Sequence, residues 1–124
     1  MKKHFTLAAL VVAQLASGNA FAHGEKPKHG GVLQAVSDLS FELVSKDGKA
    51  TIYIEDHGKP VSTAGVVGKL TVLNGTNKSE VPLAPAGDNK LATTGEAKLG
   101  KGTKAIAALV LADKKAVNVR FSVK

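Results

Sequence analysis

Apolar and polar residues alternate along most of this chain from residue 31 onward, and turn-forming residues interrupt the alternation every several positions. A period of two is typical of strands that bury one face and expose the other to water. The last stretch is the clearest example, because Val117, Val119 and Phe121 alternate with polar residues. No stretch after the N-terminal segment has a convincing 3.6-residue period, so the pattern predicts an all-β chain.

The stretch around Asp47-Gly48 is predicted to form a β-hairpin. An Asp-Gly pair readily adopts the positive φ angles that a tight turn requires. Apolar residues in alternate positions flank the turn on both sides: Phe41, Leu43, Ile52 and Ile54. We therefore expect a hairpin over residues 39–55, with these side chains facing inward.

The same alternating pattern predicts further short strands, and their number and spacing indicate the fold class. They are expected at residues 31–36, 69–73, 78–83, 91–94, 105–112 and 117–123. Pro82 and Pro85 cannot donate to a strand ladder, so their strand is expected to lie at a sheet edge or to end early. About seven short strands at this spacing favour a Greek-key, immunoglobulin-like β-sandwich, with a small closed barrel as the alternative.

The N-terminal segment has the pattern of a secretory signal peptide. A basic start at Lys2-Lys3 precedes a mostly apolar run over residues 5–15, and Ala20-Phe21-Ala22 forms an A-x-A cleavage site. The apolar run is shorter than the roughly 20 residues of a transmembrane helix, although a membrane-anchoring helix is the alternative. We expect cleavage after Ala22 and export to the periplasm.

Three segments are expected on this basis. Residues 1–22 are the signal peptide, which is removed. Residues 23–30 contain two histidines and two glycines with almost nothing apolar, which predicts a flexible arm. Residues 31–124 form a single β-sandwich domain.

Composition narrows the classes of function. Lysine and arginine outnumber acidic residues by 17 to 10, which gives a net charge of +7, but the lysines are scattered and Arg120 is the only arginine. Nucleic-acid surfaces are denser in basic residues and richer in arginine and aromatic residues. The chain has no cysteine, no G-x-S-x-G motif and no glycine-rich phosphate loop. We therefore expect neither nucleic-acid binding nor an enzyme.

The histidines offer the best candidate chemistry. His23 would be the first residue after cleavage, so its α-amine and imidazole could chelate one metal ion. His29 follows in the same arm, and Asp56-His57 could present a carboxylate and an imidazole at the end of a predicted strand. These donors suit Cu(II), Zn(II) or Ni(II), whereas the absence of cysteine and methionine after residue 22 makes a Cu(I) carrier improbable.

Each of these histidines also has a simpler interpretation as a solvated surface, linker or turn residue. Lys26 and Lys28 lie between the arm histidines and would repel a cation. A metal ion must also compete with protons for the α-amine, whose usual pKa is about 8, so affinity should fall as the pH drops.

Three segments carry a resemblance to a known family. They read H-G-G at residues 29–31, F-E-L-V at residues 41–44 and D-H-G-K-P-V at residues 56–61. They resemble small exported proteins, and accessory N-terminal regions of periplasmic adaptor subunits, associated with heavy-metal efflux systems. In that family the third segment reads D-H-x-G-K-P-V, so this chain lacks the spacer residue. The resemblance implies a context of metal stress.

A looser analogy is to the periplasmic copper-resistance carriers. These are immunoglobulin-like domains in which an N-terminal histidine, an acidic residue and a further histidine hold Cu(II). In this chain His23 and the pair Asp56-His57 are similar to that arrangement, but the spacings do not align.

The sequence thus predicts a periplasmic binding protein for Cu(II) or Zn(II) that acts as a buffer or carrier in heavy-metal resistance, with subunits of an efflux system as possible partners. The expected ligands are His23, His29, His57 and Asp56. The alternative is a non-enzymatic envelope interaction module that docks a partner through a sheet edge or surface patch, with the histidines incidental.

Overall fold

Nine β-strands make up the regular structure of residues 26–124, the part of the chain that the computed structural model describes. The predicted signal peptide and His23 lie outside this part. Within it there is no helix, and hence none that is long and apolar enough to cross a membrane. The strands are β1 (Val32–Val36), β2 (Leu39–Lys46), β3 (Lys49–Asp56), β4 (Lys59–Pro60), β5 (Val67–Asn74), β6 (Asn77–Pro85), β7 (Lys90–Thr93), β8 (Lys104–Val110) and β9 (Ala116–Ser122).

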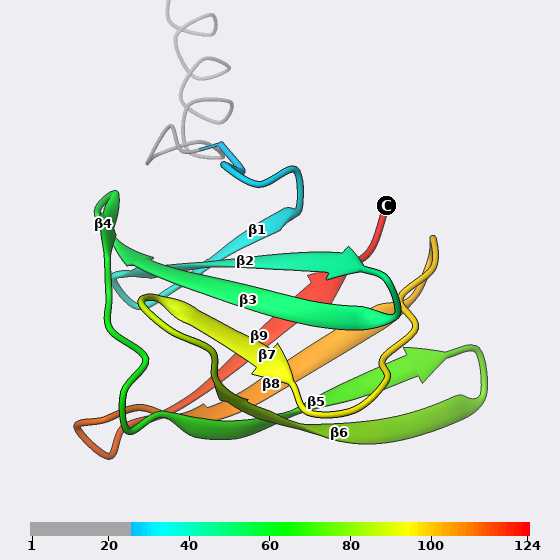
Figure 1. Cartoon of the computed structure of the whole chain (residues 1–124). Coiled ribbons are helices and arrows are strands. Elements are labelled where there is room, and N and C mark those ends of the chain that lie inside the picture. Colours follow the sequence, from blue (N-terminus) through cyan, green and yellow to red (C-terminus); the bar gives the residue numbers. More distant parts are fainter. Residues whose placement is uncertain (1–25) are drawn as a thin grey trace, which may run out of the picture.

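The strands form one antiparallel sheet with the order β1-β2-β3-β7-β6-β5-β8-β9, and β4 pairs with β3. Strands β5, β6 and β7 follow one another, and β8 returns beside β5, which is the Greek-key order. The ends of this path, β1 and β9, also lie in contact, so the sheet nearly closes. In Figure 1, β1, β2 and β3 lie over β5 and β6. The predicted all-β sandwich is confirmed, and its two layers belong to one barrel-like sheet.

The hairpin predicted around Asp47-Gly48 is confirmed as β2 and β3. Asp47 has a φ of 53° and Gly48 a φ of 78°, which are the two positive values of a type I′ turn. The turn pairs Lys46 with Lys49 and thereby sets the register of the whole hairpin. Alternate residues on each strand consequently point to the core and to the outer surface.

The core lies between the two layers of the sheet and draws on seven strands. Its largest fully buried apolar side chains come from β2, β3, β5, β7, β8 and β9: Phe41, Ile52, Ile54, Leu70, Leu91, Leu109, Val119 and Phe121. Val81 and Leu83 of β6 also belong to it. The inward positions expected from the alternating pattern are therefore the core positions.

Strand β6 corrects one expectation, because it is an interior strand that continues through Pro85. The carbonyl of Pro82 accepts a hydrogen bond from the backbone N–H of Thr94 at 3.0 Å, so the backbone polar groups of Pro82 face the β7 side. The β6–β7 pairing begins only at Leu83. The missing N–H of Pro82 therefore removes no bond from the ladder with β5.

Residues 95–102, which connect β7 to β8, lie against the core. Ala97 and Leu99 are buried within it. The backbone N–H of Ala97 donates to the carbonyl of Gly48 at 2.7 Å. This connection therefore packs beside the β2–β3 turn.

Truncation of a core side chain tests this packing. Ile52 has 0% exposure, so Ile52→Ala should lower the free energy of unfolding by about 2–5 kcal/mol in chemical denaturation. Val67 is the matched control, because its side chain is 58% exposed and Val67→Ala should change stability by less than about 0.5 kcal/mol. Equal losses in the two variants would contradict the placement of the core.

Candidate functional site

Two cross-strand pairs of polar side chains lie next to each other on the outer face of the β2–β3 hairpin. Glu42 lies opposite Tyr53, and Ser40 lies opposite Glu55. These positions alternate with the core residues of the same strands, so their side chains point away from the core. Glu42 is nevertheless only 4% exposed. Another part of the chain must therefore cover this face.

The covering segment consists of residues 26–31, which precede β1 and include the described part of the predicted arm. This segment is called the arm below. Gly30 turns the backbone with a φ of 74°, a left-handed conformation that glycine adopts without strain. Gly31 lies so close to β2 that an added Cβ would collide with the carbonyl oxygen of Leu43 and lie 2.9 Å from Val44 Cγ2. The two glycines of the H-G-G segment thus allow the arm to turn and to approach the sheet.

The buried Glu42 carboxylate binds the backbone of this arm. Its Oε1 accepts a hydrogen bond from the N–H of Lys28 at 3.0 Å, and its Oε2 accepts from the N–H groups of His29 at 2.8 Å and Gly31 at 2.9 Å. N–H groups that converge on one anion form a concave backbone site. These bonds replace the hydration that the carboxylate loses on burial.

The imidazole of His29 is held by two further contacts. Its Nδ1 lies 3.0 Å from Oε1 of Glu42. Its ring stacks on Tyr53 with a centroid distance of 3.7 Å and an interplanar angle of 5°. The side chain remains 38% exposed. The structure therefore fixes the plane and orientation of this ring while leaving part of it open to solvent.

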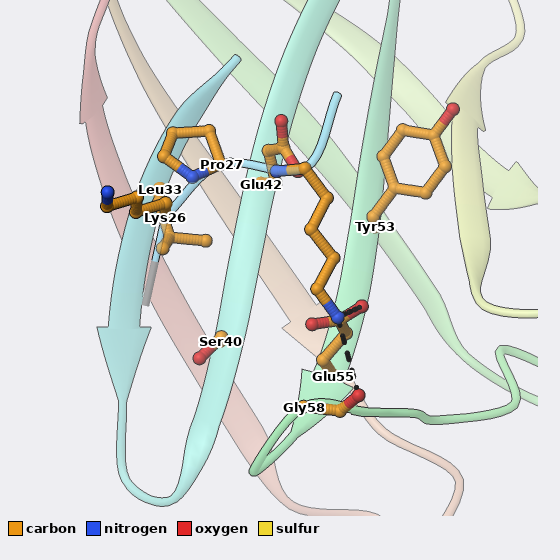
Figure 2. A pocket seen from close by; sticks show the side chains of 9 residues that line it. Lys26, Pro27, Leu33, Ser40, Glu42, Tyr53, Glu55 and Gly58 are labelled. Atoms are coloured by element: carbon orange, nitrogen blue, oxygen red, sulfur yellow. Dashed lines mark hydrogen bonds and ion pairs between the residues drawn. The ribbon is translucent and has the colours of Figure 1, made fainter. Parts of the chain in front are cut away.

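Lys28 extends along the same face, away from His29. Its Nζ donates to Oε2 of Glu55 at 3.0 Å and to the carbonyl of Gly58 at 3.4 Å. The dashed lines that end at Glu55 and Gly58 in Figure 2 mark these two bonds. Between the arm and the hairpin lies a cavity of about 410 Å³. It is lined by Lys26, Pro27, Lys28, Leu33, Ser40, Glu42, Tyr53, Glu55 and Gly58.

The pKa of the Glu42 carboxyl lies below its usual range. Burial alone raises this pKa, because the ionised form loses hydration. The hydrogen bonds from the His29 ring and from the backbone N–H groups of Gly31, His29 and Lys28 lower it and outweigh burial. Glu42 is therefore ionised at neutral pH.

Asp56 and His57 occupy the exposed turn between β3 and β4. His57 has a φ of 51° and is followed by Gly58 with a φ of 85°, so both adopt the left-handed conformation of a tight turn. Nδ1 of His57 lies 2.6 Å from Oδ1 of Asp56. This pair is half to two-thirds exposed, whereas the His29–Glu42 pair is anchored on a buried carboxylate.

The four predicted ligands do not form one cluster in the described structure. His29 bonds Glu42 and stacks on Tyr53. Asp56 and His57 bond each other, and His23 lies outside the described residues. Residues 26–124 contain no group of three or more histidine, aspartate or glutamate side chains that could hold a metal ion.

Sequence reasoning missed Glu42 and Tyr53 as site residues. A signal for them was present, since a charged residue interrupts the apolar run at residues 41–44. The predicted hairpin turn places Tyr53 directly across from it.

A substitution at Gly31 tests the close approach of the arm. Gly31→Ala should displace the arm from Glu42 and lower the free energy of unfolding by about 1–3 kcal/mol. Gly100→Ala is the matched control, because nothing lies within 4 Å of its added Cβ and its φ is not positive. Denaturation curves that coincide for both variants would show that the arm does not pack as described.

The stability contribution of Glu42 should depend on pH. Because its pKa is lowered by folding, the carboxyl stabilises the fold while ionised, and this contribution is lost as the pH falls below about 4.3 and through the folded-state pKa. Glu42→Gln should lower the free energy of unfolding by about 2 kcal/mol near neutral pH. The difference from the unmodified protein should narrow in denaturation experiments toward about pH 3.

Glu80→Gln is the control for this pH series. Glu80 is exposed and its Oε1 lies 3.4 Å from Nζ of Lys69, so its removal should leave the curve nearly unchanged. A difference between Glu42→Gln and the unmodified protein that stays constant across the series would contradict the role of the ionised carboxylate.

Comparison of the chain with protein-family models, with curated proteins and with solved structures finds no match. The resemblance to efflux-associated exported proteins therefore depends on its three sequence segments. In the structure those segments meet at one place. His29 and Gly31 come from the first, Glu42 from the second, and Gly58, whose carbonyl binds Lys28, from the third.

Proposed function

We propose that the protein is a periplasmic binding protein for a divalent transition metal, Cu(II) or Zn(II), and acts as a buffer or carrier in heavy-metal efflux. The observation that supports this best is the fixed imidazole of His29, which lies on the buried Glu42 carboxylate and stacks on Tyr53. Metal-binding histidines commonly use one ring nitrogen to bond a carboxylate, which orients the ring for the metal. His29 has this arrangement.

His23 supplies the remaining donors of the proposed site. After cleavage at the predicted position, its α-amine and imidazole would provide two nitrogen atoms. The proposal requires that residues 23–25, which precede Lys26 and can span up to about 10 Å when extended, bring His23 back to the His29 ring. Three nitrogen donors suit both Cu(II) and Zn(II).

The charges around His29 are compatible with a bound cation. Lys28 is one of the two lysines between the arm histidines. Its ammonium group is paired with Glu55 at 3.0 Å and directed toward Gly58. The ionised Glu42 lies directly beside the imidazole. An anion in contact with the ligand ring favours a cation on that ring.

The Asp56–His57 turn is a weaker candidate. The ammonium of Lys28 bonds the carbonyl of Gly58, the residue that follows His57. A positive charge at this turn opposes metal binding there, and the carboxylate that bonds His57 is exposed, whereas the one that bonds His29 is buried. We therefore place the proposed site at His23 and His29.

A metal titration tests the proposal. The exported protein, shown by mass measurement to begin at His23, is titrated with Cu(II) near neutral pH. We expect saturable binding, and both His29→Ala and a single glycine added before His23 should weaken it at least tenfold, about 1.4 kcal/mol.

His57→Ala is the matched histidine control and should leave the affinity within about threefold. Unchanged affinity in His29→Ala would remove His29 from the site. No saturable binding at all would favour the interaction module over the metal-binding protein.

A further inference from the structure

We infer that Glu42 is the positioning residue of this site: it holds the proton of the His29 imidazole at Nδ1, which leaves Nε2 as the metal-binding atom, and it couples metal binding to docking of the arm. This inference rests on the proposed function, in which His29 is a metal ligand. It adds the donor atom, the residue that selects it and the segment that metal binding should order.

The hydrogen bonds of Glu42 determine where the proton lies. The three backbone N–H bonds that Glu42 accepts favour its ionised form, which has no proton to donate, so every partner of Glu42 must be a donor. Its other partners are backbone N–H groups, which are donors already. Nδ1 of His29, at 3.0 Å from Oε1, must therefore carry a proton, since otherwise two lone pairs would face each other. In the neutral imidazole the lone pair then belongs to Nε2.

The second ring nitrogen remains open to a ligand. Glu42 contacts Nδ1 of His29, and no residue of the described part of the chain bonds Nε2. One face of the ring is covered by Tyr53, and the side chain is 38% exposed. The inference requires that the exposed part of the ring include Nε2, whose lone pair points away from the bond between Nδ1 and Glu42.

The same carboxylate ties the ring to the arm. Glu42 binds the backbone of Lys28, His29 and Gly31 as well as the imidazole. The orientation of the ring and the docked conformation of the arm therefore both depend on Glu42. A metal ion that binds the oriented ring stabilises the docked arm, and by thermodynamic linkage the docked arm strengthens metal binding.

Nitrogen NMR of the His29 ring tests the inference. Long-range proton–nitrogen correlations of the exported, nitrogen-15-labelled protein are recorded at about pH 8, where imidazole is mostly neutral. Without metal we expect the proton at Nδ1. Titration with Zn(II), which is diamagnetic, should shift the Nε2 resonance and leave the proton on Nδ1.

Two variants separate positioning from simple structural support. Glu42→Gln can offer either an acceptor or a donor to Nδ1, so both tautomers of His29 should appear and Zn(II) affinity should fall at least tenfold. Glu55→Gln removes a carboxylate from the same face that bonds Lys28 instead of His29, so the tautomer should not change. Backbone spectra of the core strands confirm that each variant is folded.

Failure of the inference about Glu42 can be distinguished from failure of the proposed metal-binding function. A proton at Nε2 in the metal-free protein overturns the inference even if metal binds, and this measurement needs no variant. Undiminished Zn(II) affinity in folded Glu42→Gln overturns it as well. A proton at Nδ1 with no response of any His29 nitrogen to Zn(II) contradicts the proposed function and, with it, the positioning role.

Discussion

The burial of the Glu42 carboxylate is the constraint on which the rest of the site depends. A buried charge is tolerated where hydrogen bonds replace its lost hydration. Three backbone N–H groups of the arm and the imidazole of His29 supply these bonds, so the arm lies on the outer face of β2 and β3. Gly31 permits that close approach, and Tyr53 provides the surface on which the ring stacks. The orientation of His29 depends on this carboxylate together with the ring of Tyr53.

Much of the fold could be predicted from local patterns, because strand alternation and turn chemistry act over a few residues. Asp47-Gly48 defines the hairpin register, and that register alone places Tyr53 across from Glu42. The docking of the arm could not be predicted in this way, because the arm has no hydrophobic period and meets residues more than ten positions away. The interior position of Pro82 likewise depends on which side its missing N–H faces, which is a property of the whole sheet.

The positions of the charged side chains change which histidine is the better candidate for a metal ligand. In the sequence, the neighbouring Lys28 makes His29 a weaker candidate for a metal ligand. The position at the end of a predicted strand makes His57 a stronger one. In the structure Lys28 reaches over the hairpin to Glu55 and Gly58, so its charge lies near the His57 turn. His29 instead contacts a buried carboxylate. Sequence neighbours alone do not give the position of a charge, because a lysine side chain can place its ammonium group several residues away from its backbone.

The central claim is that His29, oriented by Glu42, binds a divalent metal ion through Nε2. The most direct test is a crystal structure of the Zn(II)-loaded chain that begins at His23, with anomalous scattering recorded at the zinc edge. The account predicts a zinc ion about 2.0 Å from Nε2 of His29, with the α-amine or imidazole of His23 as a second ligand and Nδ1 still on Glu42. Zinc bound at His57 with His29 unoccupied, or at Nδ1 of His29 with Glu42 displaced, would contradict it.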